Sequence, residues 1–188
     1  PVTEPVAHGG GDVFDPYLVG MYIGNGCERV ISYNILDTDM HDYCAKYPGV
    51  RVITHDGKAT VRITPIYAKL VDLGLDKISY EKGIPDEYLF ADTESRKALL
   101  AGLMDTDGTV DETGQAYSYS STSEVLANQV LELVCSLGGM AEIVKRAAGY
   151  KKDGEYIKCR DCYNVRIWTD FNLFKSARKS ARWRPNLR

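Results

Sequence analysis

Apolar and small residues recur with helical spacing in two stretches of the chain that align without a gap. The first runs from Leu18 to Gly26 and the second from Leu100 to Gly108, at an offset of 82 residues. Small residues four positions apart in each stretch would let two helix backbones approach closely. These small residues are Gly20, Gly24, Gly102 and Thr106. The offset is too long for a solenoid repeat, so the pattern predicts two half-domains whose helices pack side by side, in parallel, with their C-terminal ends together.

The same order of elements recurs after each of these helices. Three- and four-residue periods predict helices over 15–24, 37–47, 65–73, 93–106, 123–137 and 171–182. Alternating patterns and turn residues predict strands over 27–33, 50–54, 60–64, 110–112, 115–121, 140–147 and 163–169. We therefore expect an α+β fold of two pseudo-symmetric αββαββα halves, with curved antiparallel sheets.

The domain boundaries follow from this repeat. Residues 1–13 are expected to be a flexible leader, 14–92 the first half and 93–188 the second half. Residues 77–90 are interpreted as a connector, and 148–161 as a basic insertion between two strands.

Composition is that of an ordinary soluble globular protein, with 44% hydrophobic and 26% charged residues in 188. No apolar run approaches the ~20 residues that cross a bilayer, so we expect no membrane partner. Five cysteines form no disulfide framework, which favours a reducing, cytoplasmic compartment with access to DNA. Cys159 and Cys162 lack the second Cys/His pair of a zinc site.

Charge is distributed unevenly along the chain. The net charge is −3, yet residues 145–188 carry thirteen Lys/Arg and four Asp/Glu. A segment this basic suits binding to phosphates. The alternative is a solvated surface that balances an acidic body.

Two carboxylates stand at the end of the second predicted helix. Asp105 and Asp107 lie where the helix dipole is already negative, so a positive group should compensate them. A divalent cation held by oxygen ligands is the obvious candidate. Asp107 aligns with Asn25 of the first stretch, whereas Asp105 is expected to be a structural residue.

The two stretches resemble the paired motifs of the LAGLIDADG homing endonucleases, and more closely those of endonuclease domains found inside inteins. Asp15-Pro16-Tyr17 and Lys82-Gly83-Ile84-Pro85, which precede the two motifs, share this resemblance. It implies a monomer that cleaves double-stranded DNA at a long asymmetric site, using Mg²⁺ or another divalent cation. It also implies that the two sheets form a DNA-binding saddle, and that the chain is part of a larger intein-containing precursor. Self-splicing is not expected from this segment.

The resemblance also assigns roles to individual residues. Asp107 and Asn25 would be catalytic metal positions, with Gly24 and Thr106 beside them. Lys82 would polarise the attacking water, and Lys179, with Lys175 behind it, would be its partner in the second half.

Asn25 departs from the family pattern, because an amide lacks the charge that helps to dehydrate Mg²⁺. An engineered substitution, natural decay toward a binding-only or nicking protein, and replacement by neighbouring carboxylates would each explain it.

Polar residues on the predicted strands and the basic tail are expected to contact DNA. They are Arg51, His55, Lys58, Arg62, Gln115, Tyr117, Tyr119, Lys145, Arg166 and Lys175. Three alternatives to an endonuclease stay open: a non-cleaving or nicking DNA-binding relative, an RNA maturase of the same fold, and a plain structural domain.

Overall fold

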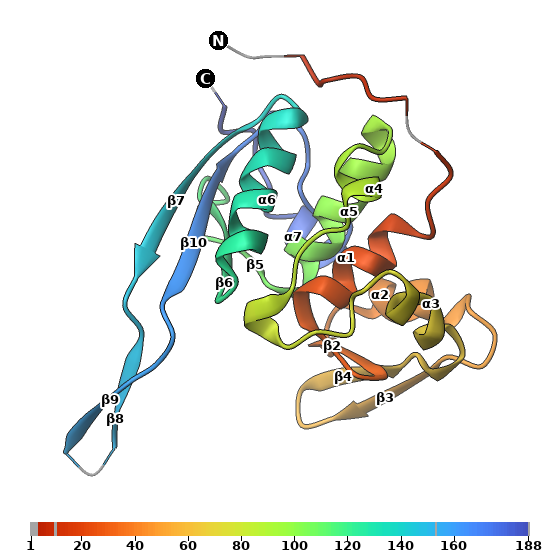
Figure 1. Cartoon of the computed structure of the whole chain (residues 1–188), viewed down its shortest axis with the longest axis horizontal. Coiled ribbons are helices and arrows are strands. Elements are labelled where there is room, and N and C mark those ends of the chain that lie inside the picture. The colour runs from red at the N-terminus through yellow and green to blue at the C-terminus, as the bar shows by residue number, and fades with distance from the viewer. Residues whose placement is uncertain (1–3, 10, 153, 188) are drawn as a thin grey trace.

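Two parallel helices form the centre of the molecule (Figure 1). The structure is a computed structural model that describes residues 4–9, 11–152 and 154–187. Helix α1 (Pro16–Asn25) begins at Asp15, whose carboxylate accepts a hydrogen bond from the amide of Leu18. Helix α5 (Thr93–Thr106) begins in the same way at Asp92. Both N-terminal caps satisfy amides that have no partner within the helix.

Glycines set the distance between α1 and α5. A Cβ atom added at Gly20 would lie 2.2 Å from the carbonyl oxygen of Leu99, and one added at Gly102 would lie 2.2 Å from that of Tyr17. Gly24 faces Thr106 in the same way, with 2.0 Å between the added Cβ and the Thr106 hydroxyl oxygen. The backbones are therefore in direct contact, as the spacing of small residues predicts.

Each half of the chain adds a four-stranded antiparallel sheet. The first has the order β1-β2-β4-β3 and the second the order β5-β6-β10-β7. The strands of the first sheet are β1 (Gly26–Cys27), β2 (Val30–Asn34), β3 (Arg51–His55) and β4 (Lys58–Arg62). Those of the second are β5 (Gly108–Val110), β6 (Tyr117–Ser121), β7 (Met140–Arg146) and β10 (Cys162–Trp168).

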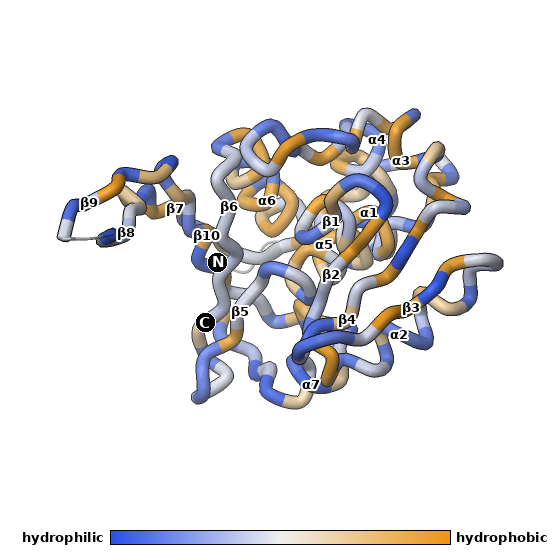
Figure 2. The backbone as a smooth tube through the Cα atoms, turned by 90° about the horizontal axis from the view of Figure 1, so that it is seen from below, coloured by the Kyte–Doolittle hydropathy of each residue, from blue (hydrophilic) through white to orange (hydrophobic). Residues whose placement is uncertain are grey.

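Helices cover one face of each sheet and enclose the core. They are α2 (Thr38–Ala45), η1 (Thr64–Ile66) and α3 (Tyr67–Asp72) in the first half, and α6 (Glu124–Ser136) and α7 (Ala177–Ser180) in the second. Alternate strand residues, such as Ala59 and Val61 of β4, are fully buried on this face. The hydropathy colouring shows the apolar segments gathered around α1 and α5 (Figure 2). No helix of the described chain has the length and apolar content that a bilayer crossing requires.

The connector and the insertion are more ordered than the sequence indicates. Residues 77–90 contain two short helices, η2 (Ser79–Glu81) and α4 (Asp86–Leu89). The insertion forms an antiparallel hairpin of β8 (Gly149–Lys152) and β9 (Glu155–Lys158). Both segments were expected to be irregular because neither has a long hydrophobic period.

The expected final helix over 171–182 is wrong in extent, since only Ala177–Ser180 is helical. The amides of Lys175 and Ser176 donate to Asp105, and that of Phe174 donates to Asn172. These three backbone amides donate to side-chain oxygens, so they cannot donate to the carbonyls of a longer helix.

The leader has one firm attachment. The amide of Val6 donates to the carbonyl of Ser136 at 2.9 Å, and the fully buried Arg96 donates to the Val6 carbonyl. A sequence of small and polar residues gives no sign of this contact, because the partner is 90 residues away in the chain.

Candidate metal pocket and nucleic-acid interface

The C-terminal ends of α1 and α5 open into one pocket. Gly24, Asn25, Lys82 and Asp107 line it, together with Tyr119 and residues 120–122. We call this the central pocket. The structure thus brings together the two aligned motif positions and the lysine of the block before the second motif.

Two lysines occupy equivalent positions at the ends of the two helices. The Lys82 ammonium donates to the carbonyls of Tyr22, Ile23 and Gly26, at 3.2, 3.0 and 2.6 Å. The Lys179 ammonium donates to the carbonyls of Met104, Asp105 and Gly108, at 2.8, 2.8 and 2.7 Å.

Each carbonyl that Lys179 contacts lies 82 positions after the corresponding carbonyl that Lys82 contacts, so the two caps are related by the internal repeat. Both lysines are only 8% exposed. A cation at this end of a helix satisfies free carbonyls and opposes the negative end of the dipole.

Burial and charge act against each other in the central pocket. Burial raises the pKa of the Asp107 carboxyl group, while Lys82 and Lys179 lower it. Burial lowers the pKa of Lys82, and it lowers that of Lys179 to about 8. Lys82 lines the central pocket beside Asp107, whereas Lys179 lies at the end of α5 outside the lining.

Asn25 is exposed, and its amide nitrogen donates to the carbonyl of Ser32 at 2.9 Å. This bond orients the amide and leaves Oδ1 as an acceptor. The Thr106 hydroxyl donates to the carbonyls of Gly102 and Leu103 and faces Gly24 across the contact between α1 and α5, and Thr106 does not line the central pocket. Gly24 has no side chain, so position 24 can offer an ion only its main-chain carbonyl.

The donor set fits a hard divalent cation, though with little charge. It comprises the Asp107 carboxylate, the Asn25 amide oxygen and main-chain carbonyls, all of them oxygen ligands. No cluster of three His, Cys, Asp or Glu side chains suited to a metal occurs among the described residues. The pocket could therefore hold Mg²⁺ only with water and DNA phosphate as further ligands.

Asp105 points away from the central pocket and has a structural role. It is 2% exposed, and its Oδ2 accepts from the Tyr17 hydroxyl at 2.7 Å and from the amides of Lys175 and Ser176. The carboxylate thereby ties α1, α5 and the C-terminal segment together.

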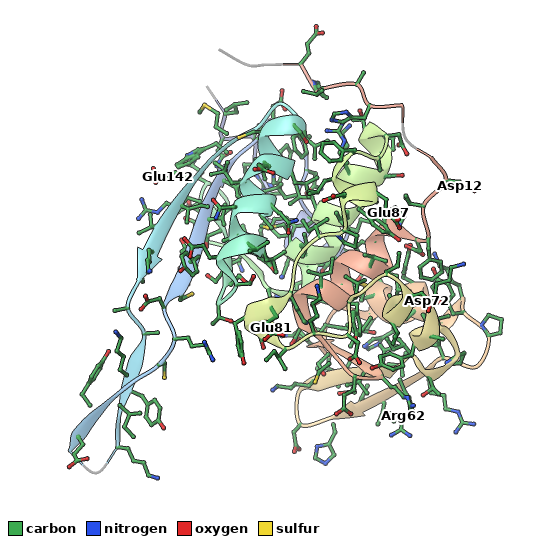
Figure 3. All side chains as sticks on the ribbon, viewed as in Figure 1. Asp12, Arg62, Asp72, Glu81, Glu87 and Glu142 are labelled. Carbon is green, nitrogen blue, oxygen red and sulfur yellow. The ribbon has the colours of Figure 1, made fainter. Side chains whose placement is uncertain are left out.

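The uncovered face of the first sheet carries several of the predicted DNA contacts. Arg51 pairs with Arg62, and His55 with Lys58, in the β3–β4 register, and all four are exposed. They alternate with the buried residues of β4, so they lie on the face away from the helices. Figure 3 shows Arg62 beneath this sheet, well separated from Glu142 on the second.

The uncovered face of the second sheet is centred on Arg166. Its register neighbours are Ser118 on β6 and Glu142 on β7, and its guanidinium contacts the Glu142 carboxylate at 2.9 Å. Gln115, Arg146 and Asn164 line the same hollow. Arg146 was not among the predicted contacts; it directly follows Lys145, and alternation along a strand does not tell which of two adjacent basic residues faces outward.

Three predicted DNA contacts lie elsewhere. Tyr117 and Tyr119 are 2% and 1% exposed on the core face, so their assignment to DNA is wrong. Lys145 pairs with Tyr163, whose hydroxyl donates to Glu124 of α6, which places Lys145 on the helix side of the sheet. Its side chain is 57% exposed and contacts Asp161, so its assignment to DNA stays a prediction.

Lys175 lies on the C-terminal segment and on neither sheet. Its ammonium sits 4.7 Å from the centre of the Tyr17 ring. It is exposed beside α1, and its backbone amide donates to Asp105 in the last turn of α5.

Residues 94–172 match the family model of the LAGLIDADG-like domain. The homing endonuclease I-DmoI in complex with DNA and Ca aligns with a TM-score of 0.55 and 13% identity, over 89% of this chain and 94% of that one. A structure of mesophilic variants of I-DmoI aligns with a TM-score of 0.54 and 14% identity, over 89% and 85%. The two structural matches show that the chain has this fold, and the family model matches part of its second half.

A curated protein of another kind is also similar in sequence. The replicative DNA helicase DnaB of Mycobacterium intracellulare is 28% identical over 166 residues. The match covers 88% of this chain, which spans a quarter of the length of that relative.

Proposed function

The chain has the fold of the LAGLIDADG homing endonucleases, and we propose that it binds duplex DNA across the uncovered faces of its two sheets and hydrolyses it at the central pocket. The observation that carries this proposal is the convergence of Asn25, Asp107 and Lys82 where α1 and α5 end. Solved complexes of I-DmoI with DNA and with metal ions support the same partner and a divalent cofactor.

The residues of the central pocket have distinct tasks in this proposal. Asp107 and the Asn25 amide oxygen would hold the cation, which supplies Lewis-acid stabilisation and a lowered pKa of bound water. Lys82 and Lys179 use their ammonium protons on helix carbonyls, so they act through their charge. Each places a fixed positive charge near the phosphate that would lie across the pocket.

Asn25 sets how strongly the pocket attracts a cation. Lys82 and Asp107 both line the central pocket, so aspartate at position 25 would add a second carboxylate beside one ammonium group, whereas the present pocket has one of each. A divalent cation enters such a pocket less favourably. The amide at position 25 favours a second candidate function. In this alternative the protein binds or nicks DNA without cutting both strands.

Both halves of the site lie in one chain, so we propose a monomer that reads a long asymmetric DNA sequence. We also propose that the chain is carried inside a larger intein-containing precursor. The match to a quarter of a helicase sequence supports this, since a nuclease fold has no evident place in a helicase.

The test compares the present chain with Asn25→Asp on supercoiled plasmid bearing a duplex site selected from a random pool by the chain itself. With Mg²⁺, we expect Asn25→Asp to linearise the plasmid at least tenfold faster. Asp107→Asn serves as the control, and should lose cleavage while retaining DNA affinity.

Equal rates for the present chain and Asn25→Asp would show that position 25 holds no cation. A preference for structured intron RNA over duplex DNA in a gel shift would instead favour a maturase.

A further inference from the structure

We propose that the β8–β9 hairpin is a DNA-binding arm that lies in the major groove beyond the second sheet. This inference rests on the proposed function. The hairpin continues β7 and β10 and extends away from the body of the molecule (Figure 1). We call residues 147–161 the arm.

A bulge sets the direction of the arm. Arg146 pairs with Cys162 in the sheet, whereas Gly149 pairs with Lys158 in the hairpin. Residues 147–148 on one side therefore oppose residues 159–161 on the other. An extra residue of this kind bends a strand pair and increases its twist.

Contacts at the base hold the arm in place. The Arg160 guanidinium lies 3.6 Å from the centre of the Tyr80 ring, and Lys145 contacts Asp161 at 3.1 Å. The amide of Cys159 donates to the carbonyl of Ala148 at 2.8 Å. Tyr80 belongs to the connector between the halves, so the base of the arm contacts the connector as well as the second sheet.

Several apolar side chains of the arm are exposed to solvent and do not pack in the core. Tyr150, Tyr156 and Ile157 are 53%, 61% and 37% exposed. Tyr150 and Ile157 face each other in the register and so share one face. A two-stranded ribbon is only marginally stable in water, and exposed apolar groups on it indicate that a partner covers them.

The charge of the arm identifies that partner as nucleic acid. Lys152, Lys158 and Arg160 are exposed, and Arg146 at the base continues into the hollow that contains Arg166. The arm itself has four Lys/Arg and three Asp/Glu, and Lys145 and Arg146 at its base bring the basic residues to six. Basic residues close to aromatic ones match phosphates at the rim and base edges within a groove.

The dimensions agree with this placement. A two-stranded ribbon fits the B-DNA major groove, which is ~12 Å wide. Four residues per strand reach about 13 Å, or about 4 base pairs at 3.4 Å each. The corresponding β3–β4 hairpin of the first half closes directly at Asp56 and Gly57, so the first half has no such arm. The arm would therefore lengthen the contact on one flank only.

The experiment uses the full chain and the duplex that it selects from a random pool. The arm variant is Lys152→Ala with Lys158→Ala, and the matched control is Lys69→Ala with Lys97→Ala, which removes the same charge from α3 and α5. We expect the arm variant to reduce the slope of log affinity against log salt by about 2. We also expect its hydroxyl-radical footprint to shorten by about 4 base pairs on one flank, with the control unchanged.

A second variant, Tyr150→Ser with Ile157→Ser, tests the apolar face and should weaken binding with little change in salt slope. All four positions are exposed, so circular dichroism should show folded protein in each case. A footprint and slope equal to those of the control would overturn the proposal and leave the arm as a surface for a protein partner. Failure of the unmodified chain to bind any duplex would overturn the proposed function as well.

Discussion

Asp105 shows what a buried carboxylate contributes at the scale of one residue. Its Oδ2 accepts three hydrogen bonds, but its buried Oδ1 has no partner among the described residues. Burial raises the pKa of this group from 3.8 to about 6, although Tyr17 and the amides of Ser176 and Lys175 lower it. The folded state therefore binds the proton more tightly than the unfolded state does.

Because folding raises the pKa of Asp105, the stability of the protein depends on pH. The stabilisation from the protonated form is present below pH 4 and is lost as pH rises through about 6. Asp105→Asn does not titrate, so its free energy of unfolding relative to the unmodified chain should rise by about 2–3 kcal/mol between pH 4 and pH 8. Urea unfolding at several pH values measures the difference, and a constant difference would show that Asp105 keeps its ordinary pKa in the folded protein.

At the scale of the element, the contact between α1 and α5 depends on glycine. An alanine Cβ at Gly102 would lie 2.2 Å from the Tyr17 carbonyl oxygen and 2.9 Å from the Gly20 Cα, both backbone atoms that cannot turn aside. Alanine favours a helix over glycine by about 1 kcal/mol, yet the helices would have to separate. We expect Gly102→Ala to destabilise the protein by about 1–3 kcal/mol.

Gly11→Ala is the matched control, since nothing lies within 4 Å of a Cβ added there. Its urea midpoint should equal that of the unmodified chain or rise slightly. A Gly102→Ala midpoint that also rises would show that the helix pair has room for a methyl group.

The elements also show where sequence reasoning succeeds and where it stops. The helix pair and its shared end were predictable, because small residues four apart and an aligned repeat are local signals. The resemblance predicts Lys179 as the partner of Lys82, and the structure places its ammonium on the carbonyls equivalent to those that Lys82 caps. Tyr117 and Tyr119 were assigned to DNA although they are buried, because a one-residue change of register inverts a strand and leaves its alternation unchanged.

At the scale of the whole molecule, the C-terminal segment joins the two halves. Ser176 donates its hydroxyl to Asp37 at 2.6 Å, and Arg178 donates to both oxygens of the same carboxylate at 2.9 Å. Asp37 precedes α2 in the first half and is 1% exposed. Burial alone would raise the pKa of Asp37, but Arg178 and Ser176 bring it below its ordinary value. The segment thus holds an otherwise unfavourable charge inside the fold.

Removing the arginine would leave that charge buried with only a hydroxyl donor. We expect Arg178→Met to lower the free energy of unfolding at pH 7 by about 3–5 kcal/mol, since a buried charge that loses its partner is costly. Arg182→Met, which removes an exposed arginine of the same segment, should cost less than 1 kcal/mol. Adding Asp37→Asn to Arg178→Met should recover part of the loss, because it removes the isolated charge.

Tryptophan fluorescence can show whether Arg178→Met destabilises both halves of the molecule. Both tryptophans, Trp168 and Trp183, lie in the second half, while circular dichroism reports on the whole chain. Because α1 and α5 share one core, we expect the two signals to change together during urea unfolding of every variant. Separate transitions for Arg178→Met, with coincident ones for Arg182→Met, would instead show that the Asp37 contact is what makes the halves unfold as one unit.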